Sequence, residues 1–151
     1  MRSASDGLTE AGRALLARTP LVVRRGPYAL AAWAPSQISA VCQGLLRARA
    51  EHGVVILDER EASAFLPESA LAEMPPARSL ERGWALLTLD ETLPWETVGI
   101  LAALASALAR AGVPLGVAAA FSRDHIYMHL DHVDTALAAL RPLVGEIRIL
   151  D

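Results

Sequence analysis

The chain has 151 residues, enough for one ordinary domain or two small ones, and a hydrophobic content of 53% excludes a disordered protein. A net charge of −3 argues against a binder of duplex nucleic acids, for which a basic stripe is expected, so we expect no nucleic-acid partner. All 14 basic residues are arginine, which excludes a catalytic lysine, and the lone Cys42 excludes an internal disulfide.

The first 19 residues predict a polar lead-in with a short helix from about Leu8 to Ala17. This segment lacks the apolar core of a signal peptide, so we expect a cytoplasmic protein. Two strands are expected next, Leu21 to Arg25 and Tyr28 to Trp33. The Gly-Pro pair between them predicts a hairpin.

The rest of the first half predicts a helix from Ser36 to about Ala50, then strands at 54–59 and 62–66. A short helix over 67–74 follows. Residues 76–83 are predicted to be a linker, because the pair Pro75-Pro76 stands at the start of this segment and Gly83 at its end.

The second half begins with an apolar strand over 84–89 and a polar loop over 90–96. Thr97 is expected to cap a helix over 98–111, with Leu101, Leu104 and Leu108 on its apolar face. Strands over 115–121 and 125–130, a helix after Asp131 and a strand over 146–150 complete the order βαββαβ, the ferredoxin-like unit.

The apolar stretch from Val98 to Phe121 is interrupted by Arg110, Gly112 and Pro114. These residues would break a membrane-spanning helix near its middle. We therefore expect a buried helix followed by a buried strand, and no membrane partner.

The two halves align without a gap at an offset of 63 residues, so that Gly53 falls on Gly116 and Arg60 on Arg123. The first half lacks a closing strand after residue 74, and we expect Leu21 to Arg25 to take that position in the first sheet. The predicted organisation is a lead-in (1–19), a variant unit (20–75), a linker (76–83) and a second unit (84–151).

The segment 95–128 resembles the ACT domain. Gly99 matches the glycine of the turn into the family's first helix, 112–114 (GVP) match the turn after it, and Phe121 and Asp124 bound a Phe-x-x-Asp turn. The resemblance covers residues 84–140, is weaker over 54–69, and extends to stand-alone tandem ACT proteins of bacteria and the CASTOR arginine sensors of animals. It implies an α+β protein of two tandem ferredoxin-like units, with antiparallel sheets that carry helices on one face.

The resemblance also implies a regulatory protein that binds an amino acid or similar small ligand at the seam between ACT units, without catalysis and without a cofactor. Carried over by position, the site comprises Phe121, Asp124 and the loop 94–99. The arginine sensors have a glycine where Pro94 stands and an acidic residue where Thr97 stands. An arginine ligand therefore lacks one partner here, and a smaller or neutral ligand is an alternative.

The chemistry of these residues also supports ligand binding in the same region. The start of a helix leaves amide groups free for a carboxylate, Asp124 can accept hydrogen bonds from an ammonium group, and aromatic rings can supply apolar walls. The expected ligand-binding residues are Trp95, Thr97, Val98, Gly99, Ile100, Phe121 and Asp124. A structural alternative remains open, in which Gly99 allows close packing of the helix on the sheet, Asp124 accepts hydrogen bonds from turn amides and Phe121 lies in the core.

Two other functions remain open. One is an interaction or dimerisation module without a ligand, acting as a homodimer or on a regulated partner protein. The other is a small metal-dependent enzyme, because His125, Tyr127 and His129 would share one face of a strand. Their spacing matches no established ligand motif.

Overall fold

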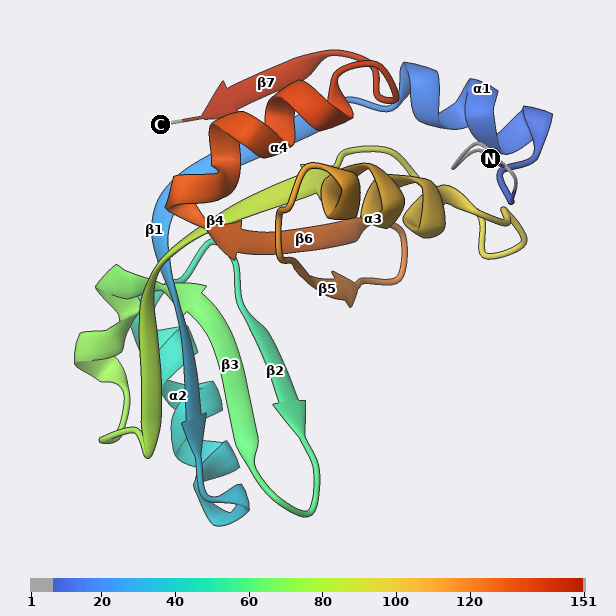
Figure 1. The fold of residues 1–151 in the computed structure, drawn as a ribbon. Coiled ribbons are helices and arrows are strands. Elements are labelled where there is room, and N and C mark those ends of the chain that lie inside the picture. Colours follow the sequence, from blue (N-terminus) through green and yellow to red (C-terminus); the bar gives the residue numbers. More distant parts are fainter. Residues whose placement is uncertain (1–6, 151) are drawn as a thin grey trace. The chain divides into compact units, whose positions relative to one another are not determined.

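The computed structural model describes residues 7–150, which form two compact units (Figure 1). Unit 1 contains the described residues up to Arg25 and those from Ala85 onward, and unit 2 contains Gly26–Trp84. Unit 2 is therefore inserted into unit 1 along the chain. Two long strands, β1 (Leu21–Trp33) and β4 (Ser79–Leu89), pass from one unit into the other.

Unit 2 has the strand order β2-β3-β1-β4, in which β2 spans Val54–Leu57 and β3 spans Ala62–Pro67. The second part of β1 runs antiparallel to β3, from Tyr28 opposite Pro67 to Trp33 opposite Ala62. The helical elements are η1 (Pro35–Gln37), α2 (Ile38–Ala48) and η2 (Glu68–Glu73). Buried Trp33, Val41 and Leu66 are at the centre of the unit's core.

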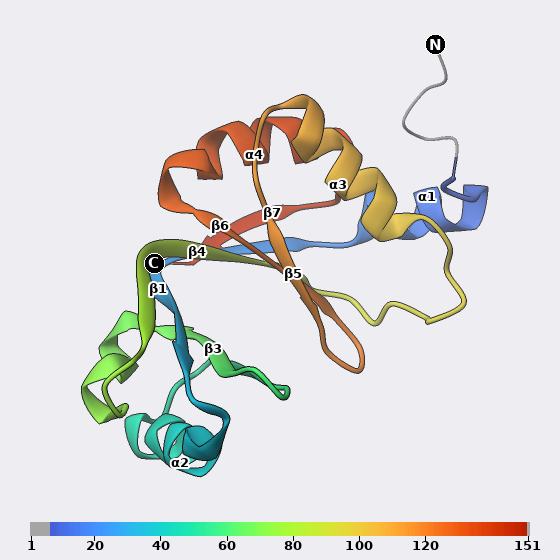
Figure 2. The same cartoon turned by 60° about the horizontal axis from the view of Figure 1, so that its bottom comes forward.

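Unit 1 has the strand order β7-β1-β4-β6-β5. Its further elements are α1 (Glu10–Arg18), α3 (Ile100–Arg110), β5 (Gly116–Ala119), β6 (Asp124–His129), η3 (Leu130–His132), α4 (Val133–Leu140) and β7 (Ile147–Leu150). Helices α3 and α4 cover one face of its sheet (Figures 1 and 2). Fully buried Leu87, Leu104 and Met128 belong to the core between these layers.

Both units confirm the predicted α+β class and the ferredoxin-like order βαββαβ. In unit 2 the second helix is the short 3₁₀ helix η2. In unit 1 the first part of β1 lies between β4 and β7, and β7 pairs with it in parallel, from Leu21 opposite Ile147 to Arg24 opposite Leu150. This extra strand is the main departure from an ordinary antiparallel ferredoxin-like sheet.

The predicted hairpin at the Gly-Pro pair is wrong, because β1 continues without reversing from Leu21 to Trp33. Gly26 has a φ of +75°, a conformation that suits glycine, and the strand resumes after Pro27. The position expected for Leu21 to Arg25 is also wrong. That segment pairs with β7 in unit 1, outside the sheet whose closing strand it was expected to supply.

Residues 76–83 are not simply a linker, because β4 begins at Ser79 and supplies the closing strand of unit 2. The backbone N–H of Arg78 donates to the carbonyl of Ala32 over 2.8 Å, which ties this segment to the end of β1. Most side chains of 79–82 are exposed, so this edge strand carries no apolar alternation.

Helix α3 begins two residues later than predicted, at Ile100, and Gly99 is its N-cap with no side-chain cap. Thr97 therefore does not cap it; its N–H donates to the carbonyl of Pro94 in a turn. The buried stripe consists of Ile100, Ala103, Leu104, Ala107 and Leu108, whereas Leu101 is 41% exposed. The predicted order of a helix followed by a strand is confirmed by α3 and β5. The expectation that this strand is buried is wrong, because β5 lies at the edge of the sheet and its residues are half-buried or exposed. No helix among residues 7–150 is long and apolar enough to cross a membrane.

Candidate functional site

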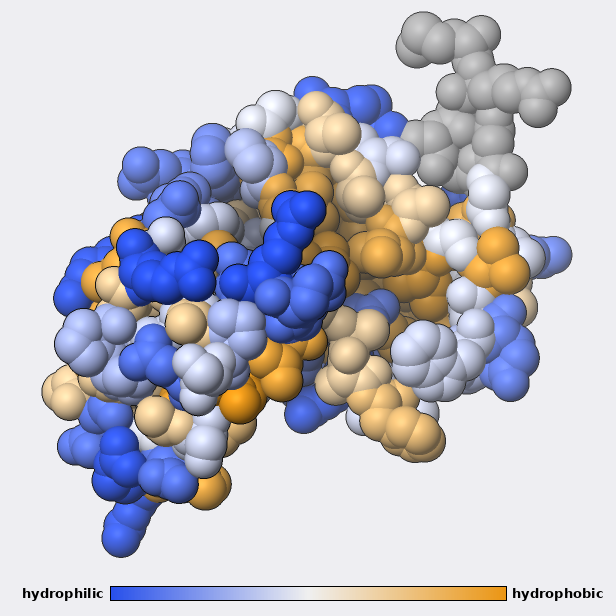
Figure 3. Space-filling view, turned by 90° about the horizontal axis from the view of Figure 1, so that it is seen from below, coloured by the Kyte–Doolittle hydropathy of each residue, from blue (hydrophilic) through white to orange (hydrophobic). Residues whose placement is uncertain are grey.

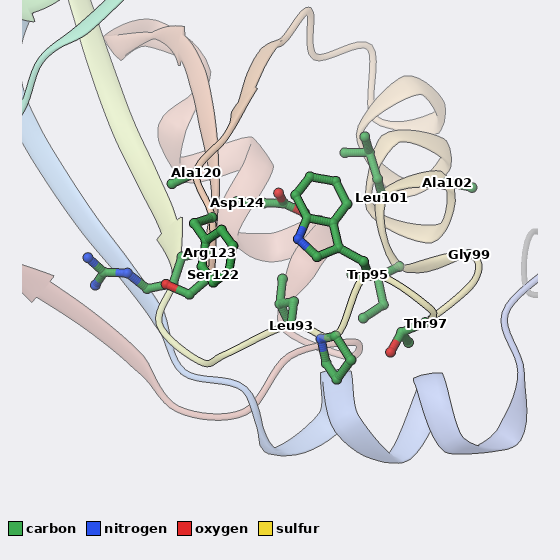
Figure 4. A pocket seen from close by; sticks show the side chains of 13 residues that line it. Leu93, Trp95, Thr97, Gly99, Leu101, Ala102, Ala120, Ser122, Arg123 and Asp124 are labelled. Carbon is green, nitrogen blue, oxygen red and sulfur yellow. The ribbon is translucent and has the colours of Figure 1, made fainter.

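A cavity of about 200 Å³ lies in unit 1, between the loop before α3 and the turn between β5 and β6 (Figure 4). The backbone N–H of Leu93 donates to the carbonyl of Ser122 over 2.9 Å, which holds the loop against this turn. The lining residues are Leu93, Pro94, Trp95, Thr97, Gly99, Ile100, Leu101, Ala102, Ala120, Phe121, Ser122, Arg123 and Asp124.

Six of the seven predicted site residues line this cavity, and Val98, which is 64% exposed, does not. The sequence analysis missed Leu101 and Ala102, because it began α3 too early and placed Leu101 on the buried face. It also missed Ala120, Ser122 and Arg123. Ala120 precedes Phe121, and Ser122 and Arg123 lie between Phe121 and Asp124. The Phe-x-x-Asp turn was therefore the available signal for them.

Gly99 allows a close approach of two backbone segments, but not the helix–sheet packing of the alternative interpretation. Its φ is +96°, and a Cβ atom there would collide with the backbone of Gly7 and Leu8. Thr97 also packs toward the N-terminal segment, since its methyl group lies 3.4 Å from where a Cβ on Gly12 would stand. Both residues thus fix the loop against the chain around α1, in addition to lining the cavity.

The first turn of α3 opens onto the cavity. Ile100, Leu101 and Ala102 occupy its first three helical positions and all line the cavity. Amides at these positions have no carbonyl partner within the helix, and the helix dipole makes this end partly positive. The delayed start of α3 therefore shifts the expected carboxylate-binding amides from 98–100 to 100–102.

Asp124 brings a carboxylate to the same cavity. Within residues 7–150 its side chain has no hydrogen bond or ion pair, so it does not accept the turn amides as the alternative supposed. The turn is closed instead by the backbone N–H of Ala120, which donates to the carbonyl of Arg123 over 2.9 Å. Partial burial raises the pKa of Asp124 above its ordinary value of 3.8.

The aromatic residues of the site are solvent-exposed. Phe121 is 91% exposed, which excludes the core position that was its alternative, and Trp95 is 73% exposed. In Figure 4 the indole of Trp95 lies beside Leu101 and Asp124, while the Arg123 side chain extends away from it. On the face drawn in Figure 3, apolar surface is open to solvent.

The histidine-rich strand offers little support for a metal site. His125 is buried, and its Nδ1 lies 2.9 Å from the hydroxyl oxygen of buried Thr88, whereas His129 is exposed. Burial lowers the pKa of His125, and the positive charges of Arg123 and Arg24 lower it further. In the described part of the chain no three His, Cys, Asp or Glu residues are grouped as metal ligands.

A sequence model of the ACT domain family matches residues 79–142, which include α3, β5, β6 and the whole cavity lining. Residues 79–142 form an ACT domain. A search of curated protein sequences finds no match.

Solved structures resemble the chain over most of its length. Protein Atu0741 from Agobacterium tumefaciens is 18% identical, with a TM-score of 0.71, and the match covers 89% of this chain and 95% of that one. VC0802 from Vibrio cholerae, described as a possible transport protein, is 24% identical with a TM-score of 0.61, covering 84% and 91%. The ligand-free regulatory subunit of aspartate kinase from Thermus thermophilus is 16% identical with a TM-score of 0.64, covering 84% and 98%. At these identities the likeness establishes the fold alone.

Proposed function

We propose that the protein is a regulatory ACT protein that binds a free amino acid in the cavity of unit 1 and has no catalytic activity. One observation carries the proposal: the same cavity presents the amide end of α3 and the carboxylate of Asp124, which has no partner among residues 7–150. These two groups are complementary to the two charges of an α-amino acid. The likeness to aspartate kinase regulatory subunits supports a regulatory role. The expectation that the ligand binds at a seam between ACT units stays a prediction.

The cavity also limits the ligand. Its volume of about 200 Å³ suits one small molecule. Leu93, Trp95 and Leu101 supply apolar lining, and no second lining carboxylate accompanies Asp124. A ligand with an apolar or neutral side chain therefore fits better than arginine, whose guanidinium group would find no carboxylate of its own.

A thermal-shift screen of the twenty amino acids against the full chain tests the proposal. A ligand that binds only the folded state at 100 times its Kd stabilises it by about 2.7 kcal/mol, which should raise the Tm by several degrees. The shift should disappear in Asp124→Asn and persist in Asp131→Asn, which removes the same charge from an exposed position outside the cavity. Absence of any shift in the wild type would contradict amino-acid binding.

The second candidate is an association module, a homodimer or a complex with a regulated partner protein. It is favoured by the exposure of Phe121 (91%) and Trp95 (73%). Analytical ultracentrifugation of the full chain measures the association constant and so tests this second candidate. Phe121→Ser should lower the association constant without loss of folded structure if this surface associates, and should leave it unchanged otherwise.

A further inference from the structure

A second cavity in unit 1 has a different chemical character. Its volume is about 240 Å³ and its lining contains three arginines and one acidic residue. The lining residues are Val22, Arg24, Thr88, Asp90, Arg123, Arg148 and Leu150. They come from β1, from β4 and the residue that follows it, from β7, and from the turn before β6.

This cavity lies on the sheet face opposite α3 and α4. Side chains alternate between the two faces of a strand. Leu21 and Val23 of β1 belong to the core under the helices, which places Val22 and Arg24 on the other face. In the same way Leu87 and Leu89 place Thr88 on that face, and Val22 stands opposite Arg148 in the β1–β7 pairing.

The arginines are incompletely neutralised. Arg123 pairs with Asp90 at 2.8 Å, and Arg148 pairs with Glu146 at 2.8 Å while lying 3.9 Å from Asp90. Arg24 has no ion pair or side-chain hydrogen bond within residues 7–150. Among residues 7–150, three guanidinium groups thus share two carboxylates, and these pairs use few of the five donors of each guanidinium.

The floor of the cavity adds no negative charge. Thr88 is 2% exposed, and its hydroxyl interacts with the ring of His125. Because burial and the charges of Arg123 and Arg24 lower the pKa of His125, both arginines lie near enough to act on one ring. Their positive charges therefore converge over a neutral, buried floor.

We propose that this cavity is a second ligand site, which binds a small multivalent oxyanion between the guanidinium groups of Arg24, Arg123 and Arg148. Guanidinium groups bind carboxylates and phosphates through paired N–H donors, so the ligand carries one of these two groups. A water's share of volume is about 30 Å³, so a cavity of about 240 Å³ holds several ligand atoms beyond the anion itself. Val22 and Leu150 provide an apolar wall for the part of the ligand beyond its anionic group.

The site is separate from the proposed amino-acid site, although Arg123 lines both cavities. A test must therefore use a residue found only in the second cavity. Arg24 meets this condition and has no partner in the described residues whose loss would complicate the variant.

The experiment titrates the full chain with inorganic phosphate and, separately, with citrate, at constant ionic strength maintained by chloride. Binding is followed through backbone amide shifts of Arg24, Thr88 and Arg148. We expect saturable shifts at these amides with at least one of the two anions. The anion that binds identifies the ligand group as phosphate or carboxylate.

Arg24→Gln should weaken the binding of that anion about tenfold or more, the effect of losing a charge-assisted hydrogen bond. Arg13→Gln is the matched control, since Arg13 is exposed on α1 and outside both cavities, and it should bind as the wild type does. Arg24→Lys, which keeps the charge, should retain part of the affinity.

No saturable shift with either anion, or an equal loss in Arg24→Gln and Arg13→Gln, would overturn the proposal. Amide spectra in chloride alone verify that each variant is folded. Because these variants leave Asp124 and the first turn of α3 intact, amino-acid binding can be measured in the same samples, and failure of one site is distinguishable from failure of the other.

Discussion

At the scale of single residues, the partly buried carboxylate of Asp124 is expected to lower the free energy of unfolding at neutral pH. Burial raises its folded pKa above 3.8, so the folded chain holds a proton that the unfolded chain has already released. The free energy of unfolding therefore falls as the pH rises from 3.8 through the folded pKa. This loss of stability persists at neutral pH, where Asp124 is ionised. We expect Asp124→Asn to be at least as stable as the wild type in urea at pH 7. A clear loss, with Asp131→Asn unaffected, would show that Asp124 has a structural partner.

His125 gives the opposite pH dependence. Its pKa is lowered from 6.5 by burial and by Arg123 and Arg24, so the unfolded chain takes up a proton first as the pH falls. Its contribution to stability is present above pH 6.5 and is lost as the pH falls through the folded pKa. Urea unfolding at pH 7 and pH 5 should show a smaller acid loss in His125→Asn than in the wild type. Exposed His129→Asn is the control, and an equal loss in all three proteins would be evidence against this effect.

Gly99 allows a close approach of two backbone segments. Gly99→Ala introduces both a strained φ and a collision with Gly7 and Leu8, and should lower the free energy of unfolding by at least about 2 kcal/mol. Gly112 is the matched control, since its φ is +71° with no atom within 4 Å of a Cβ. Gly112→Ala should cost only about 1 kcal/mol. Equal losses in urea unfolding would mean that the contact with residues 7 and 8 contributes nothing.

At the scale of elements, α3 shows which part of a helix the sequence can predict. The periodicity of Leu104 and Leu108 correctly indicated an amphipathic helix. The start was misplaced, because Thr97 is a typical cap by residue type while Gly99 caps through its backbone conformation. The residues that contact Gly99, residues 7 and 8, lie far away in sequence. No local sequence pattern could therefore predict that the helix begins after Gly99.

The buried stripe of α3 gives a direct packing test. Leu104→Ala removes a fully buried side chain and should lower the free energy of unfolding by about 2–5 kcal/mol. Leu101→Ala, on the same helix but 41% exposed, should cost less than about 1 kcal/mol. Chemical denaturation of both variants measures the two losses in the free energy of unfolding. A larger loss in Leu101→Ala than in Leu104→Ala would show that α3 is rotated about its axis, with Leu101 on the buried side.

Strands β1 and β4 show where prediction failed. The Gly-Pro pair in β1 has the local signature of a turn, yet Leu21–Arg24 pairs with β7 and Tyr28–Trp33 pairs with β3. The pairing partners of the two parts lie in different units, and they keep the strand extended. In β4 the exposed edge segment at 79–82 is polar, so it lacks the alternation by which strands are recognised.

At the scale of the whole molecule, each unit contains its own helix-strand-strand series, which is why the repeat and the fold class could be predicted. The insertion of unit 2 into unit 1 could not, because it depends on which strand each part of β1 joins. Six of the seven predicted site residues line one cavity because they lie on two short segments that the family resemblance had marked. The arginine-lined cavity went unnoticed, since its residues come from four separated segments.

The central claim is that the cavity of unit 1 recognises both charges of an amino acid. Calorimetric titration of the full chain with the amino acid found in the screen, and with the same acid lacking its α-ammonium group, tests it most directly. The wild type should bind the amino acid about tenfold or more tightly than the analogue, and Asp124→Asn should bind both equally weakly. Equal binding of the two compounds by the wild type, or full preference retained in Asp124→Asn, would contradict the account.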